Sequence, residues 1–312
     1  MIESHQIQER FQDPLTLAGL LKAAWCGKWL IIAATFCAGL GSIYAALQMP
    51  NMYTSEAILA PKEEKGISGV SGQLGGLASL AGIDIGGGNG NKTDIALEVL
   101  KSRKFLSDFV NRHEIAPALV AANGWLHESD RLTFDEEIYN PLSDQFVRTV
   151  EFPYTQEPSD WELYERFKNI MSLSRDPSNG MITVGIEFYS PYLAQQWTSK
   201  LVEDLNLEMR QRDREQAKRS IEYLQNELAN ESIDNIRDLF FGLIEEQLKT
   251  KMLAEVTPEY AFTVVNPPQV TLLKSAPKRS LIVIVVTFLA GFISTLLVVM
   301  YNTSGRAART KG

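Results

Sequence analysis

The sequence predicts an α+β membrane protein, in which two transmembrane helices flank a split β-α-β-β-α-β base that carries a long protruding helical hairpin. Three observations lead to this class. One uncharged apolar run lies near each end of the 312-residue chain. Segments with strand-like composition alternate with helical segments in the order of the split motif. About 65 residues between Pro191 and Pro258 contain no proline and a single glycine, which favours unusually long helices.

Both apolar runs are long enough to cross a bilayer. Residues 29–48 and 280–301 contain no charged side chain, and about 20 residues at ~1.5 Å per residue cover a hydrocarbon core of ~30 Å. The first run is longer than the apolar part of a signal peptide, and no small-residue cleavage site follows it. A buried core helix is the alternative for the second run, but that run is apolar all round and lies close to the chain end.

The flanking charges predict which side of the membrane each part occupies. Two spans leave both termini on the same side, and the flanks carry basic residues at Lys22, Lys28, Arg306, Arg309 and Lys311. By the positive-inside tendency we expect residues 1–28 and 302–312 to be cytoplasmic. Residues 49–279 then form a domain outside the cytoplasmic membrane, with long helices at about 191–255. Lys274, Lys278 and Arg279 disagree with this orientation, because they lie on the outer side of the second span.

Charge and cysteine content exclude several classes. The formal net charge is −8 for the whole chain, and it becomes −11 once residues 1–49 and the three bases of the tail are removed. An acidic domain without a basic stripe is a poor nucleic-acid binder, so we expect no nucleic-acid partner. The two cysteines, Cys26 and Cys37, belong to the first span or its edge. The outer domain therefore has no disulfide and must be held by its core.

The stretch GGGNGNKTD, residues 86–94, resembles a phosphate-binding loop. It differs from G-x-x-x-x-G-K-[ST] only at Asn91, which replaces the second glycine. Such a loop needs a strand before it and glycine where backbone amides curl round the phosphate. The preceding LASLAGIDIG is a weak strand, and the compartment inferred above lacks a ready supply of nucleoside triphosphate. We therefore interpret Gly86–Asn91 as a pliable connection near a subunit boundary, within a Gly- and Ser-rich segment.

The remaining elements follow from local patterns. A first strand is expected at Met52–Pro61, and a helix from Thr93 or Asp94, either of which suits the N-cap position. Residues 113–165 predict short helices. An Asp-Pro and Asn-Gly turn joins two alternating strands, and a last strand follows the long helices. These strands are expected at residues 171–174, 181–188 and 259–265.

The long proline-free stretch predicts two helical arms. Pro191 suits the first turn of a helix, and residues 230–235 offer the best place for a turn, so the arms have roughly 40 and 25 residues. An apolar stripe follows both arms. Its residues are Leu201, Leu205, Ala217, Ile221, Leu224, Leu228, Ile236, Phe240, Leu243 and Leu248. The stripe is expected to bury the arms against each other or against adjacent subunits, and the pattern leaves both open.

No group of residues predicts catalysis. The acids at residues 135–137 are neighbours, whereas the carboxylates of a glycosidase lie opposite one another across a cleft. His113 and His127 lack metal-ligand spacing, and we interpret them as surface or helix-end residues. Ser190 and Ser199 lack the glycine-flanked turn of a hydrolase nucleophile. We expect no catalytic residue, no metal and no cofactor, and therefore no enzyme.

The two predicted spans carry small residues at helix-packing spacings. They are Ala34, Ala38, Gly41 and Ala45 in the first span, and Gly291 and Thr295 in the second. Small residues let helix backbones approach closely. They favour pairing of the two spans with each other, or contact with further copies or a partner.

Several stretches together resemble the chain-length determinant (Wzz) family of bacterial polysaccharide co-polymerases. They are the strand Tyr53–Ala57, the segment GGLASLAGI, the helix ALEVLKSRKFL and the closing EYAFTVVNPPQVTLLKSAPKRSLIVI. The resemblance covers nearly the whole chain and is strongest at residues 40–110 and 255–300. The family's proline-rich pattern is P-x-x-P-x-x-x-x-S-P-K. Pro268, Pro277 and Lys278 match it, whereas Thr271 and Ala276 replace its second proline and its serine.

This resemblance implies an inner-membrane protein whose periplasmic domain assembles into a ring of identical subunits. In the family, that assembly sets the modal length of a lipid-linked polysaccharide, such as the O-antigen of lipopolysaccharide, together with a separate membrane polymerase. The implied partners are further copies of this chain, the polymerase, the lipid-linked glycan and the lipid bilayer. The motif and assembly candidates are Pro267, Pro268, Pro277, Lys278, Gly291, Gly41, Gly86, Gly87 and Gly88.

Two other classes share part of this pattern. A transmembrane receptor also has two spans around an outer sensor, but it needs a cytoplasmic output domain. A membrane-tethered periplasmic adaptor of a polysaccharide or other export machine also has long helices, usually with lipoyl-like β modules between them. A large homo-oligomer in detergent without any exporter would favour the co-polymerase.

Overall fold

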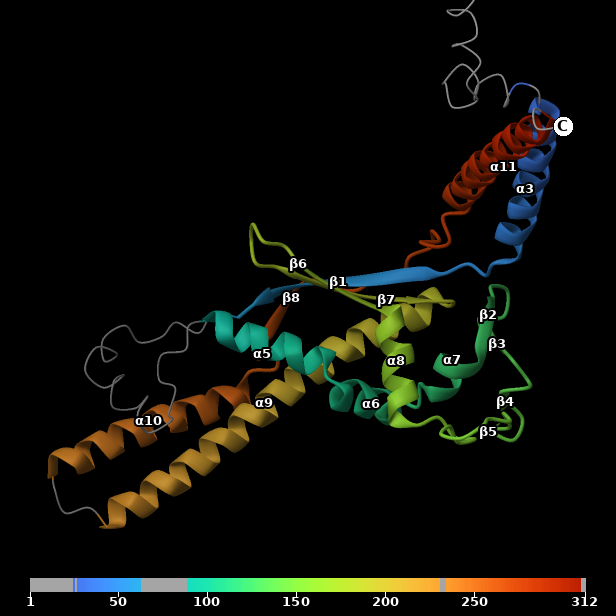
Figure 1. The fold of residues 1–312 in the computed structure, drawn as a ribbon. Helices are drawn as coiled ribbons and strands as arrows, with labels where there is room; N and C mark the ends of the chain where they lie inside the picture. Colours follow the sequence, from blue (N-terminus) through green and yellow to red (C-terminus); the bar gives the residue numbers. More distant parts are fainter. Residues whose placement is uncertain (1–24, 26, 63–88, 231–233, 310–312) are drawn as a thin grey trace, which may run out of the picture. The chain divides into compact units, whose positions relative to one another are not determined.

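A computed structural model describes residues 25, 27–62, 89–230 and 234–309. The chain divides into two compact units. The terminal unit combines both chain ends, Met1–Asn51 with Ala276–Gly312, and the central unit is Met52–Ser275. Helices and strands occur together, so the predicted mixed α and β class is confirmed at this level (Figure 1).

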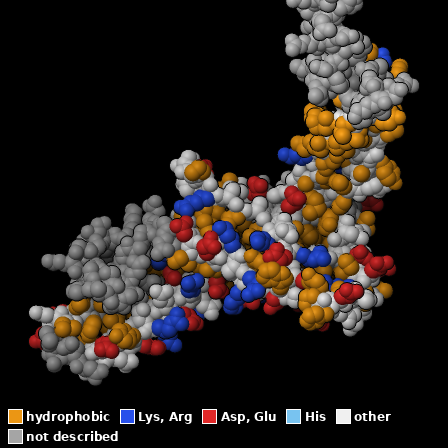
Figure 2. Space-filling view, in the orientation of Figure 1, with side chains coloured by type: hydrophobic (Ala, Val, Ile, Leu, Met, Phe, Trp, Pro, Cys, Tyr) orange, Lys and Arg blue, Asp and Glu red, His pale blue; other side chains and the backbone are white. Residues whose placement is uncertain are grey.

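In the terminal unit, two apolar helices pack against each other. They are α3 (Lys28–Gln48) and α11 (Arg279–Arg309). Lys28–Gln48 and Arg279–Tyr301 are long and apolar enough to cross a membrane, with mean hydropathies of 2.0 and 2.8. On the face seen in Figure 2, hydrophobic side chains cover much of this helix pair. Two apolar helices near the termini are consistent with a two-pass membrane protein.

Glycine allows the two terminal helices to approach closely. A Cβ atom added at Gly291 would lie 3.4 Å from the hydroxyl oxygen of Thr35, and one at Gly39 would lie 3.4 Å from that of Thr287. These contacts place Gly291 at the contact between α3 and α11. Gly41 is different, because a Cβ added there would meet nothing within 4 Å.

One antiparallel sheet organises the central unit, with its strands in the order β6-β7-β1-β8. Its strands are β1 (Tyr53–Pro61), β6 (Met171–Arg175), β7 (Ile182–Phe188) and β8 (Phe262–Asn266). Strand β1 pairs with β7 from Tyr53 opposite Phe188 to Leu59 opposite Ile182. The first strand and the hairpin were therefore predicted correctly.

The last strand begins three residues later than predicted. Residue 259 was expected to start it, but β8 starts at Phe262. The preceding residues are instead bound to α9 (Pro191–Asn230). Its Asn206 accepts a hydrogen bond from the amide of Ala261, and its Asp213 accepts one from the hydroxyl of Tyr260. These side-chain contacts hold residues 260 and 261 on the helix.

Two helices occupy the region where one helix was expected to begin at Thr93 or Asp94, and the first of them begins earlier. The first, α5, spans Asn89–Lys101, so neither expected residue is its N-cap. Ser102 has extended backbone angles and caps the next helix, α6 (Arg103–Arg112), by accepting a hydrogen bond from the amide of Phe105. Residues 89–91 lie in α5, so the pliable connection expected over Gly86–Asn91 is wrong for these three residues. Gly86, Gly87 and Gly88 lie outside the described residues.

Residues 113–165 contain strands as well as the expected short helices. The helices are α7 (Ala116–Ala121) and α8 (Asp160–Ile170). Two small antiparallel pairs lie between them: β2 (Ala122–Leu126) with β3 (Arg131–Phe134), and β4 (Tyr139–Asn140) with β5 (Gln145–Phe146). These strands were missed, because they are too short for an alternating pattern to show.

In each of the two small hairpins, a strand side chain donates a hydrogen bond to an aspartate in the turn. The indole nitrogen of Trp125 donates to the carboxylate of Asp130 at 2.8 Å. Tyr139 donates its hydroxyl hydrogen to Asp144, and this bond raises the pKa of Tyr139 to about 12. Both aspartates have positive φ, a conformation that asparagine and aspartate adopt more readily than most residues.

The two predicted helical arms are present. They are α9, with 40 residues, and α10 (Asp234–Val256), with 23 residues, and they run side by side (Figure 1). The expected apolar stripe is divided between two environments. Leu201 and Leu205 belong to the core under the sheet, whereas Ala217, Ile221 and Leu224 are buried outside that core. Leu248 is exposed, so its predicted burial is wrong within one subunit.

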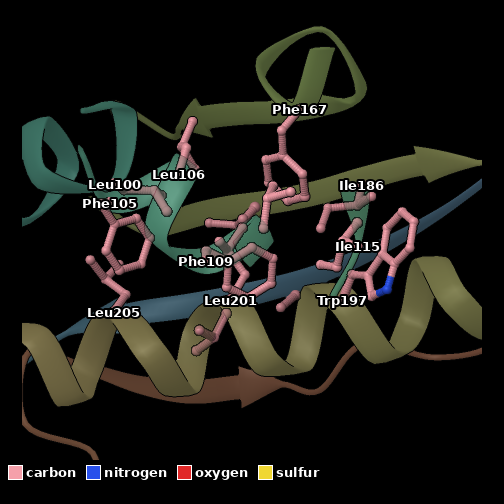
Figure 3. Packing of buried hydrophobic residues seen from close by; sticks show 14 of the residues in the cluster. Leu100, Phe105, Leu106, Phe109, Ile115, Phe167, Ile186, Trp197, Leu201 and Leu205 are labelled. Atoms are coloured by element: carbon pink, nitrogen blue, oxygen red, sulfur yellow. The ribbon is translucent and has the colours of Figure 1, made fainter. Parts of the chain in front are cut away.

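The core of the central unit lies between the sheet and its helices. Figure 3 shows Phe105 and Phe109 of α6 above Leu201 and Leu205 of α9. The ring of Phe109 meets that of Phe167 edge-on with centroids 5.2 Å apart, and such pairs add to the gain from burial. The largest fully buried side chains are Phe109, Phe167, Phe262, Leu59, Leu100, Leu106, Ile115, Ile182, Ile186, Leu201, Leu205 and Leu224.

Candidate functional site

The chain leaves the central unit through residues 267–275, which we call the exit segment. This segment follows β8 and lies beside the start of β1. Ser55 donates its hydroxyl hydrogen to the carbonyl of Gln269 at 2.8 Å, and Thr271 donates to the carbonyl of Thr54 at 2.8 Å. The amide of Ser275 donates to the carbonyl of Met52 at 2.9 Å. Both connections to the terminal unit therefore leave the central unit at one place.

Buried hydroxyl groups fix this arrangement to the long helix. Thr54 and Ser275 share a hydrogen bond of 2.8 Å between their hydroxyl oxygens. The carbonyl of Ser55 accepts a hydrogen bond of 3.2 Å from Thr198 of α9. Both Ser55 and Thr198 are fully buried. The exit segment is thus bound to β1, and β1 in turn is bound to α9.

The proline-motif residues occupy two places. Pro267 is exposed, and the carbonyl of Pro268 accepts a hydrogen bond of 3.4 Å from the side chain of Gln195. Pro277 and Lys278 belong to the terminal unit, where the carbonyl of Lys278 accepts hydrogen bonds from the first turn of α11. Thr271, which stands where the resemblance expects a proline, supplies a hydrogen bond that proline has no group to make.

Several residues of this site were missed from the sequence. Thr54, Ser55, Thr198 and Ser275 carry the hydrogen bonds, and none was a candidate. Their signal is a set of hydroxyl side chains at the start of a strand and in the segment before the second span. The pairing between them joins residues about 200 positions apart, so no local pattern could show it.

The helices α5, α6 and α9 form a charged groove of about 560 Å³. Its apolar floor is Ile95, Val99, Phe105 and Phe109, and its charged residues are Asp94, Glu98, Lys104, Asp108, Arg112, Asp204, Glu208 and Arg212. Arg112 donates to the carboxylate of Asp204 at 2.8 Å, and His113 Nε2 lies 2.9 Å from the same carboxylate. The Arg112–Asp204 contact is an ion pair between α6 and α9, and the His113 contact joins the end of α6 to the same carboxylate.

The candidates for chemistry occupy structural positions. His113 is the C-terminal cap of α6, as expected of a helix-end residue. His127 is exposed, and its ring lies 5.1 Å from that of Trp125. Asp135 accepts a hydrogen bond from the amide of Glu137 and so shapes a turn. Within the described ranges, no group of three or more His, Cys, Asp or Glu residues could hold a metal ion.

A buried ion pair holds the loop before α8. The guanidinium group of Arg148 donates two hydrogen bonds to the carboxylate of Glu162, at 2.7 and 2.9 Å. The two side chains are 9% and 11% exposed. Arg148 also donates to the carbonyls of Thr155 and Gln156. Arg148 lowers the pKa of Glu162, because its hydrogen bonds favour the charged carboxylate.

We expect Glu162→Gln to lower the free energy of unfolding by about 2 kcal/mol at pH 7, because Arg148 then keeps a buried charge without its partner. The pKa of Glu162 is lower in the folded than in the unfolded protein. The stabilisation is therefore complete above the unfolded pKa, near 4.5, and is lost as the pH falls through the folded pKa. Urea unfolding of both proteins in detergent should give a difference that shrinks in acid. Glu165→Gln, on the same helix, is the control, and a pH-independent difference would contradict the assignment.

The fold defines a class of protein: a mixed α and β domain placed between two apolar helices that could cross a membrane. Residues 13–113 match the family model described as chain length determinant protein, Wzz. This match confirms the resemblance to the Wzz family that the sequence motifs indicated. Among solved structures, the chain is similar to a full-length bacterial polysaccharide co-polymerase, at 16% identity and a TM-score of 0.37, over 93% of this chain and 99% of that chain. Comparison with curated proteins finds no match.

Proposed function

We propose that this protein regulates the modal chain length of a lipid-linked bacterial surface polysaccharide, the O-antigen of lipopolysaccharide or a similar glycan. The observation that carries the proposal is the match of residues 13–113 to the chain length determinant family. The protein acts as a non-catalytic scaffold beside a separate membrane polymerase. It lies in the inner membrane, with residues 49–279 in the periplasm and both termini in the cytoplasm.

The domain architecture supports a scaffold. The strand order β6-β7-β1-β8 supports a split β-α-β-β-α-β base for the periplasmic domain. The α9–α10 pair supports a hairpin that protrudes from this base, since α10 packs mainly on α9. A helix of 40 residues has a length of ~60 Å by helix rise. Such a helix carries surface far from the sheet without adding a second core.

Assembly converts this shape into a regulator. Closed symmetry repeats one surface around a ring, so that weak contacts with a glycan or a polymerase are multiplied. The hairpins of neighbouring copies set the height and the rim of the ring. Because both chain connections leave the central unit beside Met52 and Ser275, each copy is tethered to its two spans at a single place.

Deletion of the gene tests the proposal. We expect polymerisation to continue and the length distribution of the glycan to broaden, because a scaffold sets length without making the bonds. The measurement is the banding of lipopolysaccharide, or of the related surface glycan, on a gel. Complementation with the intact gene is the control and should restore the modal length. An unchanged ladder would contradict the proposed function, and a complete loss of polymer would indicate a catalytic or export role instead.

A further inference from the structure

Part of the exit segment presents two leucines to solvent. Leu272 is 75% exposed and Leu273 is 81% exposed, and the neighbouring Lys274 is exposed as well. The backbone on both sides is fixed, by Thr271 bonded to Thr54 and by Ser275 bonded to Met52. The three residues thus form a short projection held at both ends.

Burial of these two adjacent leucines would be favourable in free energy, because their backbone is already fixed. A single exposed leucine is ordinary in soluble proteins. Full burial of one leucine side chain is worth about 2 kcal/mol relative to exposure. The Thr271 hydroxyl and the Ser275 amide bond the chain to β1 and Met52 on either side of the pair, and both leucine side chains stay exposed. The described residues of the central unit therefore leave both leucines uncovered.

Chain connectivity limits where this projection lies. Leu273 precedes Arg279, the first residue of α11, by six residues, which reach at most about 20 Å when extended. Arg279 also donates to the carbonyl of Met49 at 2.9 Å and to the side chain of Asn51 at 3.0 Å. The outer ends of α3 and α11 are therefore tied together. On the membrane placement proposed above, the leucines cannot lie far from the bilayer surface.

The charges beside the leucines match a lipid surface. Lys274 and Lys278 are both exposed, and neither is needed for the positive-inside orientation, which they oppose. Lysine side chains at a membrane interface bury their methylene groups and place the ammonium among lipid phosphates. An apolar pair followed by lysine, just before a span, has the composition of an interfacial anchor.

We propose that Leu272, Leu273 and Lys274 dock on the outer leaflet of the membrane, with the leucines at the headgroup and acyl boundary and Lys274 on the phosphates of anionic lipids. The inference rests on the proposed two-pass placement. The docked projection holds the exit segment, and the start of β1 that is bonded to it, at the bilayer surface.

Spin-label accessibility in the full chain tests this contact. Cys26 and Cys37 are first replaced by alanine, and a nitroxide is attached at Leu272→Cys or Leu273→Cys. The protein is reconstituted in vesicles of phosphatidylcholine with phosphatidylglycerol. We expect the ratio of oxygen to nickel-chelate accessibility to be several-fold higher at both positions than at Leu142→Cys, a matched leucine that is 97% exposed. The ratio at Leu273 should fall when phosphatidylglycerol is omitted, and this fall should disappear with Lys274→Gln.

A label at Ile293→Cys, within α11, separates the two proposals. If that label is in lipid while the Leu273 label is as accessible to nickel as the Leu142 label, the docking is wrong and the membrane placement stands. If the Ile293 label is also in water, the two-pass placement itself fails. If the Leu273 label is shielded from both reagents and shows spin–spin broadening, a second copy of the chain covers the leucines, and the lipid contact is overturned.

Discussion

Replacing Asn206 by alanine is expected to lower the free energy of unfolding of the central unit by about 2 to 3 kcal/mol. Asn206 is buried in α9 and its side-chain oxygen accepts hydrogen bonds from the amides of Ala261 and Phe262, at 2.8 and 2.9 Å. Its side-chain nitrogen donates to the carbonyl of Phe262 at 3.1 Å. Alanine leaves these three backbone groups unpaired at about 1 kcal/mol each, and its better helix propensity returns roughly 0.5 kcal/mol.

The loss of stability should be concentrated at β8, the edge strand of the sheet. Phe262 begins β8 and pairs with Pro61 of β1, so loss of its partners loosens the edge strand before the rest of the core. Urea unfolding in detergent measures the total loss, and hydrogen exchange of β8 measures its location. Gln225→Ala, at an exposed position of the same helix, is the control and should cost less than ~0.5 kcal/mol. Equal effects of the two substitutions would show that Asn206 does not hold β8.

Asn206 also shows why part of the fold could not be predicted. The spans, β1, the hairpin β6–β7 and the two long helices each have a local signal: an uncharged run, an alternating strand, an Asn-Gly turn or a long absence of proline. The start of β8 has none, because it depends on a side chain 56 positions earlier in the sequence. The strands β2 to β5 were missed for a different reason, because with two to five residues each they are too short to show an alternating pattern.

The candidate site likewise contains residues that a local pattern predicts and residues that it does not. The resemblance pointed to Pro268, Pro277 and Lys278, because a linear motif can be read from one sequence. The hydrogen bond between Thr54 and Ser275 spans 221 positions and has no linear signature. Exposure of Leu272 and Leu273 is equally invisible in sequence, where two leucines before a span suggest a buried strand or the start of a helix. Only the structure shows that both side chains are exposed.

The second large effect is expected from Leu224→Asp in the helical hairpin. Leu224 is 2% exposed and lies outside the core under the sheet, on the part of α9 beyond Met209. Loss of a buried leucine costs about 2 to 5 kcal/mol, and a carboxylate at the same place adds the cost of an unpaired buried charge. Because α10 packs mainly on α9, the substitution should release α10 while the sheet stays folded. Hydrogen exchange should show loss of protection in Asp234–Val256 and retained protection in β1 and β7.

Tyr223→Asp is the matched control, because it places the same charge one residue away at a position that is 60% exposed. It should leave the protection of α10 unchanged. If the hairpin sets the height and rim of the assembly, Leu224→Asp should also broaden the glycan ladder, as deletion of the gene does, whereas Tyr223→Asp should preserve the modal length. Released α10 with a normal ladder would mean that length is set by the base of the domain and not by the hairpin. Unchanged protection of α10 would mean that contacts other than the apolar stripe hold the two arms together.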